Sequence, residues 1–310
     1  MYLTLLTDAT CDLPSSVITR FEAKVLPTIL EPLNRSDGTL WVDDRSHKHT
    51  QAVYHRMTES KDKPWRSLGG DTDAFILNLT DHWIYHSDSL QVITPAQAWS
   101  PTHQKLRESS FVVQPELDQR REAANLKGHY RVRLLDSGQL YAGYGLVMHE
   151  TMDLHREHKV SIDKLRKPLD AFRKRVQMLY SCPDPGRLHR LKDPRFETLG
   201  WLKQQQLRLG GTPIFSLHDD QHNLIERAPR KQSVDHLLNR ILEELEERRI
   251  TYRVVNVSYA GPLAEVRTRP LFRKLHEVVL HQGGHVWLST MSATSAVELG
   301  RGALSVAFVV

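Results

Sequence analysis

The stretch TDATCDLP, residues 7–14, places two carboxylates and two threonine hydroxyls directly after a short apolar run. The apolar run predicts a buried strand, and the proline that ends the stretch predicts the start of a helix. Asp8, Thr10 and Asp12 therefore lie at the carboxyl end of a strand, where parallel sheets build their ligand sites. Carboxylates in such a place act as bases or metal ligands, or they fix the amides of the loop.

Standard catalytic signatures are absent from the sequence. It contains no GxxxxGK[ST] phosphate loop and no GxSxG nucleophile elbow. The GYG of Gly143–Gly145 lacks the third glycine of a dinucleotide fingerprint and lies within a helical pattern. Close packing of a helix against a sheet is the better explanation for these glycines. We therefore assign no catalytic residue.

Two histidine-rich stretches contain side chains that bind metals elsewhere. In HETMDLHREH, His155 and His158 stand three residues apart, but the HExxH spacing is not met. A solvated helix end is the better interpretation of that stretch. In HDDQH, residues 218–222, the same residue types are equally typical of a hairpin turn. We predict no metal site.

Three predicted helix starts carry hydroxyl side chains. In ITPAQAWSPTHQKL, Ser100 is predicted to cap a helix whose first residue is Pro101. Ser67 and two glycines in WRSLGGDTDAFIL lead into another helix, and STMSATSAVELG repeats the pattern. Helix N-termini carry free N–H groups and a partial positive charge, so they receive anions. Ordinary capping explains any one of these starts, whereas several together favour an anion site.

The composition is that of a soluble globular protein, with 40% hydrophobic and 25% charged residues over 310 positions. A net charge of +5 and a pI near 9.1 would allow an acidic partner. The basic residues, however, alternate with acidic ones along predicted helices, as in RILEELEERR. The densest basic run, KLRKPLDAFRKR, is interpreted as a solvated helix face rather than a surface for nucleic acid or anionic lipid.

No apolar run approaches the ~20 residues of a membrane-spanning helix, and no basic stretch precedes the apolar N-terminus. We therefore expect neither membrane insertion nor a signal peptide. Two cysteines, Cys11 and Cys182, cannot form a disulfide framework. A reducing, cytoplasmic location is expected.

The first half of the chain alternates predicted strands and helices. Strands are expected at YLTLLTDA, LQVITPA and YRVRLLDS, and KVLPTILEP is expected as a second strand interrupted by a proline. This alternation predicts a mostly parallel sheet covered by helices on both faces. We assign residues 1–158 to an N-terminal α/β domain.

From about Val160 the pattern changes. Helices predicted around KLRKPLDAFRKRV and FETLGWLKQQQLRL flank the strand QMLYSC, and TPIFSLHDDQHNLIERA predicts a β-hairpin. A charged amphipathic helix follows, and then strands and helices in turn. We assign residues 159–310 to a C-terminal α+β domain, so the expected fold class is α/β with two domains.

Along essentially its whole length the sequence resembles the DegV family of two-domain bacterial fatty-acid-binding proteins. TDATCDLP resembles the family's opening T-D-S-T-x-D-L-P, and WSPTHQK is similar to its L-S-G-T-Y-Q-S segment. LLDSGQLYAGYGLVMHE is similar to the family's glycine-containing helix start. TPIFSLHDDQHNLIERAPRKQSVDHLL resembles its hairpin, which is followed by an arginine and a basic helix start.

The chain departs from the family pattern at three places. Arg66 stands where the threonine of a T-S-Q-P-S loop would be, and Pro101 replaces the glycine after the family's key serine. MSATS replaces the family's H-T-G-P-G segment, so Met291 occupies the position of a histidine that helps to hold the ligand's acid group.

The resemblance implies a fatty acid held between the two domains, without a cofactor. It also implies a set of ligand-binding residues from both domains, with hydroxyls at the carboxylate and an arginine nearby: Thr10, Ser67, Ser100, Thr102 and Arg227. Asp8 and Asp12 are expected to fix loop amides rather than to touch an anionic ligand. Burial of the acyl chain contributes ~0.8 kcal/mol per methylene and needs only an apolar tunnel.

In the family, the bound acid is presented to a separate fatty acid kinase. The resemblance therefore implies a binding protein, not an enzyme, with such a kinase as its partner. An alternative is a phosphoryl-transfer or hydrolytic enzyme of a related fold that uses a cleft around Asp8 and Asp12. A third possibility is a divergent member that binds another amphiphile.

Overall fold

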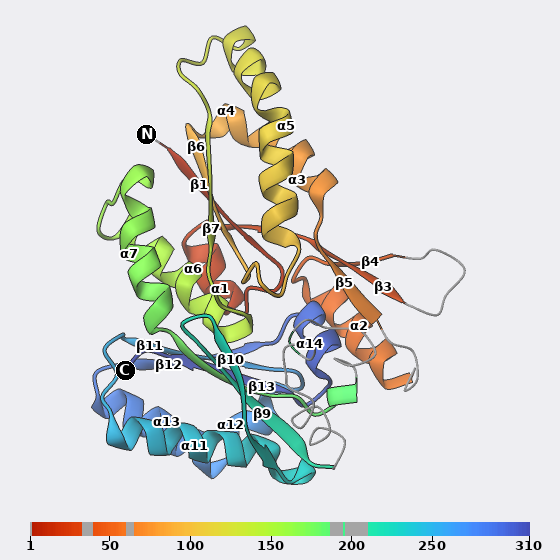
Figure 1. The fold of residues 1–310 in the computed structure, drawn as a ribbon, viewed down its shortest axis with the longest axis vertical. Helices are drawn as coiled ribbons and strands as arrows, with labels where there is room; N and C mark the ends of the chain where they lie inside the picture. The colour runs from red at the N-terminus through yellow and green to blue at the C-terminus, as the bar shows by residue number, and fades with distance from the viewer. Residues whose placement is uncertain (1, 33–39, 60–64, 187–194, 196–209) are drawn as a thin grey trace.

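The computed structural model describes residues 2–32, 40–59, 65–186, 195 and 210–310. Its elements form two packed halves, with the N-terminal half above and the C-terminal half below in Figure 1. Each half is organised around its own sheet, and a third, smaller sheet lies beside them.

A four-stranded parallel sheet forms the centre of the N-terminal half, in the order β2-β1-β6-β7. Its strands are β1 (Leu3–Asp8), β2 (Lys24–Leu26), β6 (Ser89–Thr94) and β7 (Arg131–Asp136). One face packs against α3 (Thr72–Asn78), the π-helical turn η1 (Leu79–Trp83), α4 (Ile84–His86) and α5 (Thr102–Ala123). The other face packs against α1 (Ser15–Arg20) and α6 (Tyr141–Arg156). The predicted parallel sheet with two covered faces is confirmed.

A three-stranded antiparallel sheet was not predicted from the sequence. It has the order β4-β3-β5 and consists of β3 (Thr28–Pro32), β4 (Trp41–Asp43) and β5 (Trp65–Gly70), with α2 (His47–Glu59) after β4. The predicted interrupted strand KVLPTILEP is in fact two strands of different sheets, β2 and β3. Pro27 separates them because it has no N–H for a ladder, and its carbonyl accepts a hydrogen bond from Asp71 N at 2.8 Å.

A six-stranded mixed sheet forms the centre of the C-terminal half, in the order β10-β9-β8-β13-β11-β12. Its strands are β8 (Gln177–Ser181), β9 (Thr212–His218), β10 (Gln221–Ala228), β11 (Val254–Tyr259), β12 (His285–Thr290) and β13 (Leu304–Phe308). Its lower face in Figure 1 packs against α11 (Ser233–Glu247), α12 (Leu263–Arg267) and α13 (Pro270–His281) around a separate apolar core.

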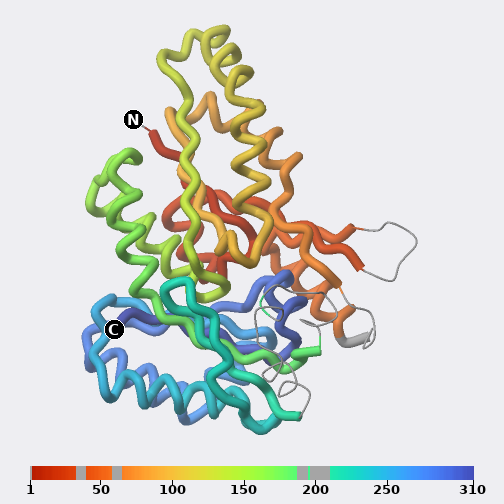
Figure 2. Tube along the Cα trace, viewed as in Figure 1, coloured from red at the N-terminus to blue at the C-terminus, as the bar shows by residue number. Residues whose placement is uncertain are grey.

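The helix α6 lies between the parallel sheet and the mixed sheet, and most of its residues are buried (Figure 2). A side-chain carbon on Gly145 would stand 2.6 Å from Asn256 Nδ2 on β11 and 2.8 Å from the carbonyl oxygen of Asp12. Only glycine fits at that distance. The prediction that close packing explains the glycines of GYG is therefore confirmed for Gly145.

The predicted hairpin is formed by β9 and β10, and both residues of its turn, Asp219 and Asp220, have positive φ angles. The predicted helix KLRKPLDAFRKRV is α7 (Ile162–Arg175), which packs against α6. The predicted helix FETLGWLKQQQLRL lies outside the described residues. A division of the chain at residue 158 stays a prediction. Among the described residues, no helix combines the length and the apolar character needed to cross a membrane.

Candidate ligand-binding site

Three of the predicted ligand residues, Ser67, Ser100 and Thr102, come together beside the carboxyl ends of β1 and β6. Ser100 Oγ donates to Thr102 Oγ1 at 3.1 Å, and Thr102 Oγ1 also accepts from Gly70 N at 3.0 Å. Ser67 Oγ accepts from Gly69 N at 3.1 Å. We call these three side chains with the amides of the two glycines the hydroxyl cluster.

The two glycines of the hydroxyl cluster allow β5 to approach the start of α5 closely. Gly69 has a φ of +85°, and a side-chain carbon there would lie 3.1 Å from both Pro101 Cγ and Thr102 Oγ1. A side-chain carbon on Gly70 would lie 2.9 Å from Leu26 Cδ2. Larger residues at either position would push the β5 backbone away from the hydroxyls of α5.

One detail of the predicted helix starts is wrong. The helix α5 begins at Thr102, with Pro101 in the capping position, so the predicted Ser100 cap is displaced by one residue. Ser100 Oγ still accepts a hydrogen bond from Thr102 N at 3.3 Å. Ser67 lies in strand β5, and the cap of the following helix α3 is Asp71, whose carboxylate accepts from Ala74 N.

Asp8 lies next to the hydroxyl cluster at the end of β1. Its Oδ1 accepts from Thr10 N at 2.9 Å and from Thr10 Oγ1 at 2.5 Å, so it fixes a loop amide as predicted. Its Oδ2 is buried and forms no hydrogen bond of normal geometry with a described residue. Burial raises the pKa of Asp8 to about 6, although the hydroxyls of Thr10 and Thr102 oppose the rise. A second anion placed here would compete with an ionised Asp8.

Asp12 ties the opening loop to the C-terminal half of the molecule. Its Oδ1 accepts from Arg45 Nη1 and from Ser292 N, both at 2.8 Å, and its Oδ2 accepts from Ser258 Oγ at 2.9 Å. Burial raises the pKa of Asp12 to about 6, against the effect of the Arg45 guanidinium. Because both carboxylate oxygens already have partners, Asp12 acts as a structural link, and its predicted role in fixing a loop amide is confirmed.

Asp43, at the end of β4, binds the first turn of α14 (Ala293–Leu299), a helix that begins within the MSATS segment. Its Oδ2 accepts from Thr294 N at 2.7 Å and from Thr294 Oγ1 at 2.8 Å. Met291 is fully buried, and its carbonyl accepts from Tyr54 Oη at 3.0 Å. In this chain, the segment where the family has a histidine is therefore held by hydrogen bonds with Asp43 and Tyr54.

Arg227 lies on β10, opposite Pro213, with Nη2 3.8 Å from the place of a side-chain carbon on Gly211. The same hairpin carries His222. The centroid of its ring lies 5.7 Å from that of Trp99, the residue before Ser100 of the hydroxyl cluster. His222 Nε2 is 2.7 Å from Tyr180 Oη. The hairpin therefore contacts the residue before Ser100, while a role for Arg227 at the ligand stays a prediction.

Sequence reasoning missed Lys105, Asp43 and His222 as neighbours of these groups. Lys105 lies one helical turn after Pro101, and its Nζ donates to the carbonyl of Leu68 within β5 at 2.6 Å. The available signal was the lysine that ends WSPTHQK where the family's segment ends in serine. Asp43 and His222 act across sheets, and no local pattern indicates such contacts.

Arg66 does not point into the hydroxyl cluster. Its guanidinium is exposed and pairs with Glu31 Oε2 at 2.6 Å on the neighbouring strand β3. Where the family has a threonine, this chain therefore has an ion pair on the surface of the three-stranded sheet. Within the described part of the chain, no group of three or more His, Cys, Asp or Glu side chains is arranged to hold a metal ion.

These features define an α/β protein of two packed halves with a polar cluster near their junction. The family model described as an uncharacterised protein of the DegV family matches residues 3–310, and the chain belongs to the DegV family. A DegV domain-containing protein of Xanthomonas campestris pv. campestris is 26% identical over 325 residues, which cover 99% of this chain and 97% of that protein.

Two solved structures show the same fold. A stearic-acid-binding protein from Eubacterium ventriosum has a TM-score of 0.79 at 15% identity, and the match covers 100% of this chain and 98% of that one. The fatty acid kinase B3 protein of Streptococcus pneumoniae, crystallised with linoleic acid, has a TM-score of 0.73 at 12% identity, with 100% and 99% covered. At these identities the likeness establishes the fold.

Proposed function

We propose that this protein binds a long-chain fatty acid between its two halves, with the acid group at the hydroxyl cluster. The observation that carries the proposal is the meeting of Ser67, Ser100 and Thr102 at two glycine amides within a DegV fold. The solved neighbours from Eubacterium ventriosum and Streptococcus pneumoniae bind stearic and linoleic acid, respectively, which supports the same ligand class here.

The chemistry of the hydroxyl cluster suits a carboxylate. Hydroxyl donors bind an anion without burying a compensating charge, and each hydrogen bond to a charged group contributes about 1.5–3 kcal/mol. The two glycine amides donate to Ser67 Oγ and Thr102 Oγ1 and so orient these hydroxyls. Lys105, whose Nζ donates to the carbonyl of Leu68, supplies a positive charge one helical turn after Pro101. Arg227 is proposed as a further cation from the second half, and Thr10 as part of the wall.

The protein is proposed to act as a binding partner and not as an enzyme. The neighbour from Streptococcus pneumoniae is a component of a fatty acid kinase, and we propose that this chain presents its ligand to such a kinase in the cytoplasm. Asp12 and Asp43, the strongest candidates for a hydrolytic cleft besides Asp8, are engaged by Arg45, Ser292 and Thr294. We propose residues 1–158 and 159–310 as the two domains that hold the ligand.

The test is a substitution of Ser100 by aspartate. Aspartate accepts the hydrogen bond from Thr102 N as serine does, so Ser100→Asp is expected to keep its melting temperature in the ligand-free state. Its charge repels a bound carboxylate, and fatty-acid affinity measured by calorimetry is expected to fall at least about tenfold. Ser16→Asp, an exposed serine in the first turn of α1, is the matched control and should bind as the parent does. Unchanged affinity in Ser100→Asp would place the carboxylate elsewhere.

A further inference from the structure

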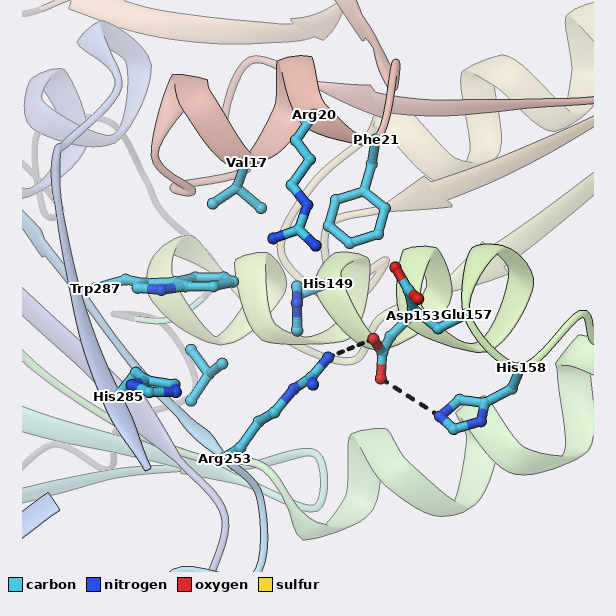
Figure 3. A pocket seen from close by; sticks show the side chains of 11 residues that line it. Val17, Arg20, Phe21, His149, Asp153, Glu157, His158, Arg253, His285 and Trp287 are labelled. Carbon is cyan, nitrogen blue, oxygen red and sulfur yellow. Dashed lines mark hydrogen bonds and ion pairs between the residues drawn. The ribbon is translucent and has the colours of Figure 1, made fainter. Parts of the chain in front are cut away.

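A cavity of about 430 Å³ lies on the seam between the two halves, away from the hydroxyl cluster. Its walls come from α1 and α6 above and from β11 and the edge strand β12 below, as Figure 3 shows. Four apolar side chains, which include an indole and a phenyl ring, share the lining with polar and charged residues: Val17, Phe21, Val254 and Trp287. Such walls suit a flat, apolar group.

His149 is one of the polar residues of the lining, which also include Arg20, Asp153, Glu157, His158, Arg253 and His285. The side chain is almost completely buried, and its ring meets the rings of Phe21, Tyr252 and Trp287 edge-on, at 5.9, 5.8 and 4.7 Å. Its Nδ1 lies 2.6 Å from Tyr252 Oη. Burial lowers the pKa of His149 to about 4, so the imidazole is neutral at pH 7.

The tautomer of His149 follows from its neighbours. Burial raises the pKa of Tyr252, and the neighbouring Glu150 carboxylate raises it further. A carboxylate can only accept, so it takes the Tyr252 hydroxyl proton and leaves Tyr252 Oη as an acceptor for His149. We therefore assign the His149 proton to Nδ1, where it is donated to Tyr252 Oη. Nε2 is left as an acceptor, and no described residue forms a hydrogen bond with it.

Two guanidinium groups reach the cavity from opposite halves of the molecule. Arg253, the residue before β11, forms an ion pair with Asp153, which also lies 3.7 Å from His158 Nε2. Arg20, at the end of α1, forms no ion pair with a described residue. It lies over the ring of Phe21 and points toward His149 in Figure 3. Arg20 is thus a cation available to a bound anion.

We propose that this cavity binds a small aromatic carboxylate that carries a hydroxyl or N–H donor. The aromatic ring packs beside Phe21 and Trp287, the carboxylate pairs with Arg20, and the donor group reaches His149 Nε2. Glu157 at the rim repels a ligand with more than one negative charge, so a monoanion is favoured. Because the walls belong to both halves, an occupant joins α1 to the edge of the mixed sheet.

The experiment is calorimetry on the full chain with 6-hydroxynaphthalene-2-carboxylate as the probe. The parent is expected to bind it, and Arg20→Gln is expected to bind about tenfold more weakly because the carboxylate loses its charged partner. Val17→Trp fills the cavity and should abolish binding. Arg248→Gln, at the end of α11 and outside the cavity, is the matched control and should bind as the parent does.

The donor group is tested by comparison with naphthalene-2-carboxylate, which lacks the hydroxyl. The parent is expected to prefer the hydroxylated probe, and His149→Phe should remove that preference. Melting temperatures without probe identify any variant that fails to fold. No binding by the parent, or binding by both Arg20→Gln and Val17→Trp as tight as that of the parent, overturns the proposal.

Discussion

Asp8 has a carboxyl group that is buried beside the hydroxyl cluster, and its pKa is raised to about 6. If a fatty-acid carboxylate occupies the cluster, the two negative charges repel each other, so the bound state raises the pKa of Asp8 further. The complex then holds more protons than the free protein does. Fatty-acid affinity must therefore be highest below pH 6 and must decrease as Asp8 ionises.

We expect the affinity of the parent to fall about tenfold between pH 5.5 and pH 8, and that of Asp8→Asn to stay nearly constant. Asparagine retains an acceptor for Thr10 N but does not ionise. Calorimetry or a fluorescent fatty-acid probe measures both curves, and the difference between them cancels the ionisation of the ligand itself. An equal pH dependence in the two proteins would show that the ligand's acid group is not beside Asp8.

The helix α6 is the element that joins the two halves, and its glycines permit the close contact. A side-chain carbon on Gly145 meets Asn256 Nδ2 and the backbone of Asp12, neither of which is free to move away. The nearest atoms to a side-chain carbon on Gly143 all belong to the side chain of Gln139, which can shift more readily than a backbone carbonyl can. The two glycines of one short motif therefore differ in what surrounds them.

We expect Gly145→Ala to lower the free energy of unfolding by about 1–3 kcal/mol, the usual cost of overpacking, despite the better helix propensity of alanine. Gly143→Ala is the control on the same helix and should cost distinctly less. Urea unfolding followed by circular dichroism compares the two variants. A Gly145→Ala protein at least as stable as Gly143→Ala would contradict the close approach of α6 to β11.

The sequence predicted individual strands and helices better than it predicted which strands pair with one another. The parallel strands, the hairpin around Asp219 and the long helix after Ser100 follow from period, turn residues and a proline, which are local signals. The division of KVLPTILEP at Pro27 depends on which sheet each half pairs with, and that pairing is set by contacts distant in sequence. Ser67 precedes α3 as expected, but its place in β5 depends on pairing with β3 and was not predicted.

For the site, the structure shows only where the predicted residues lie, and their roles at a ligand stay predictions. Ser67, Ser100 and Thr102 were chosen from hydroxyls near helix starts and from the family resemblance, and the structure brings them together. The links from Asp12 to Ser258 and from Asp43 to Thr294 span more than 240 residues, so no spacing rule reveals them. These contacts depend on how the two halves pack together.

At the scale of the whole molecule, the two halves are joined by buried polar links as well as by apolar packing. Asp12 connects the opening loop to β11 and to the residue before α14, and Tyr54 on α2 donates to the carbonyl of Met291. These links hold the hydroxyl cluster close to the C-terminal half. The proposed ligand at the cluster would therefore lie near residues of both halves.

We expect the isolated protein neither to hydrolyse ATP nor to phosphorylate a fatty acid by itself. The sequence has no phosphate loop, and the carboxylates of Asp12 and Asp43 are occupied by internal hydrogen bonds. A coupled assay for ADP release, with and without fatty acid, measures any turnover. Steady turnover that Asp8→Asn abolishes would favour the hydrolytic or phosphoryl-transfer alternative.

The central claim is that this protein carries a fatty acid, and native mass spectrometry of the purified protein tests it most directly. A mass increase equal to one long-chain fatty acid is expected, and solvent extraction should return that acid. Added fatty acid should also raise the melting temperature of stripped protein, because the ligand binds the folded state alone. Folded protein that yields no lipid on extraction, and whose melting temperature does not respond to added fatty acids, would contradict the claim.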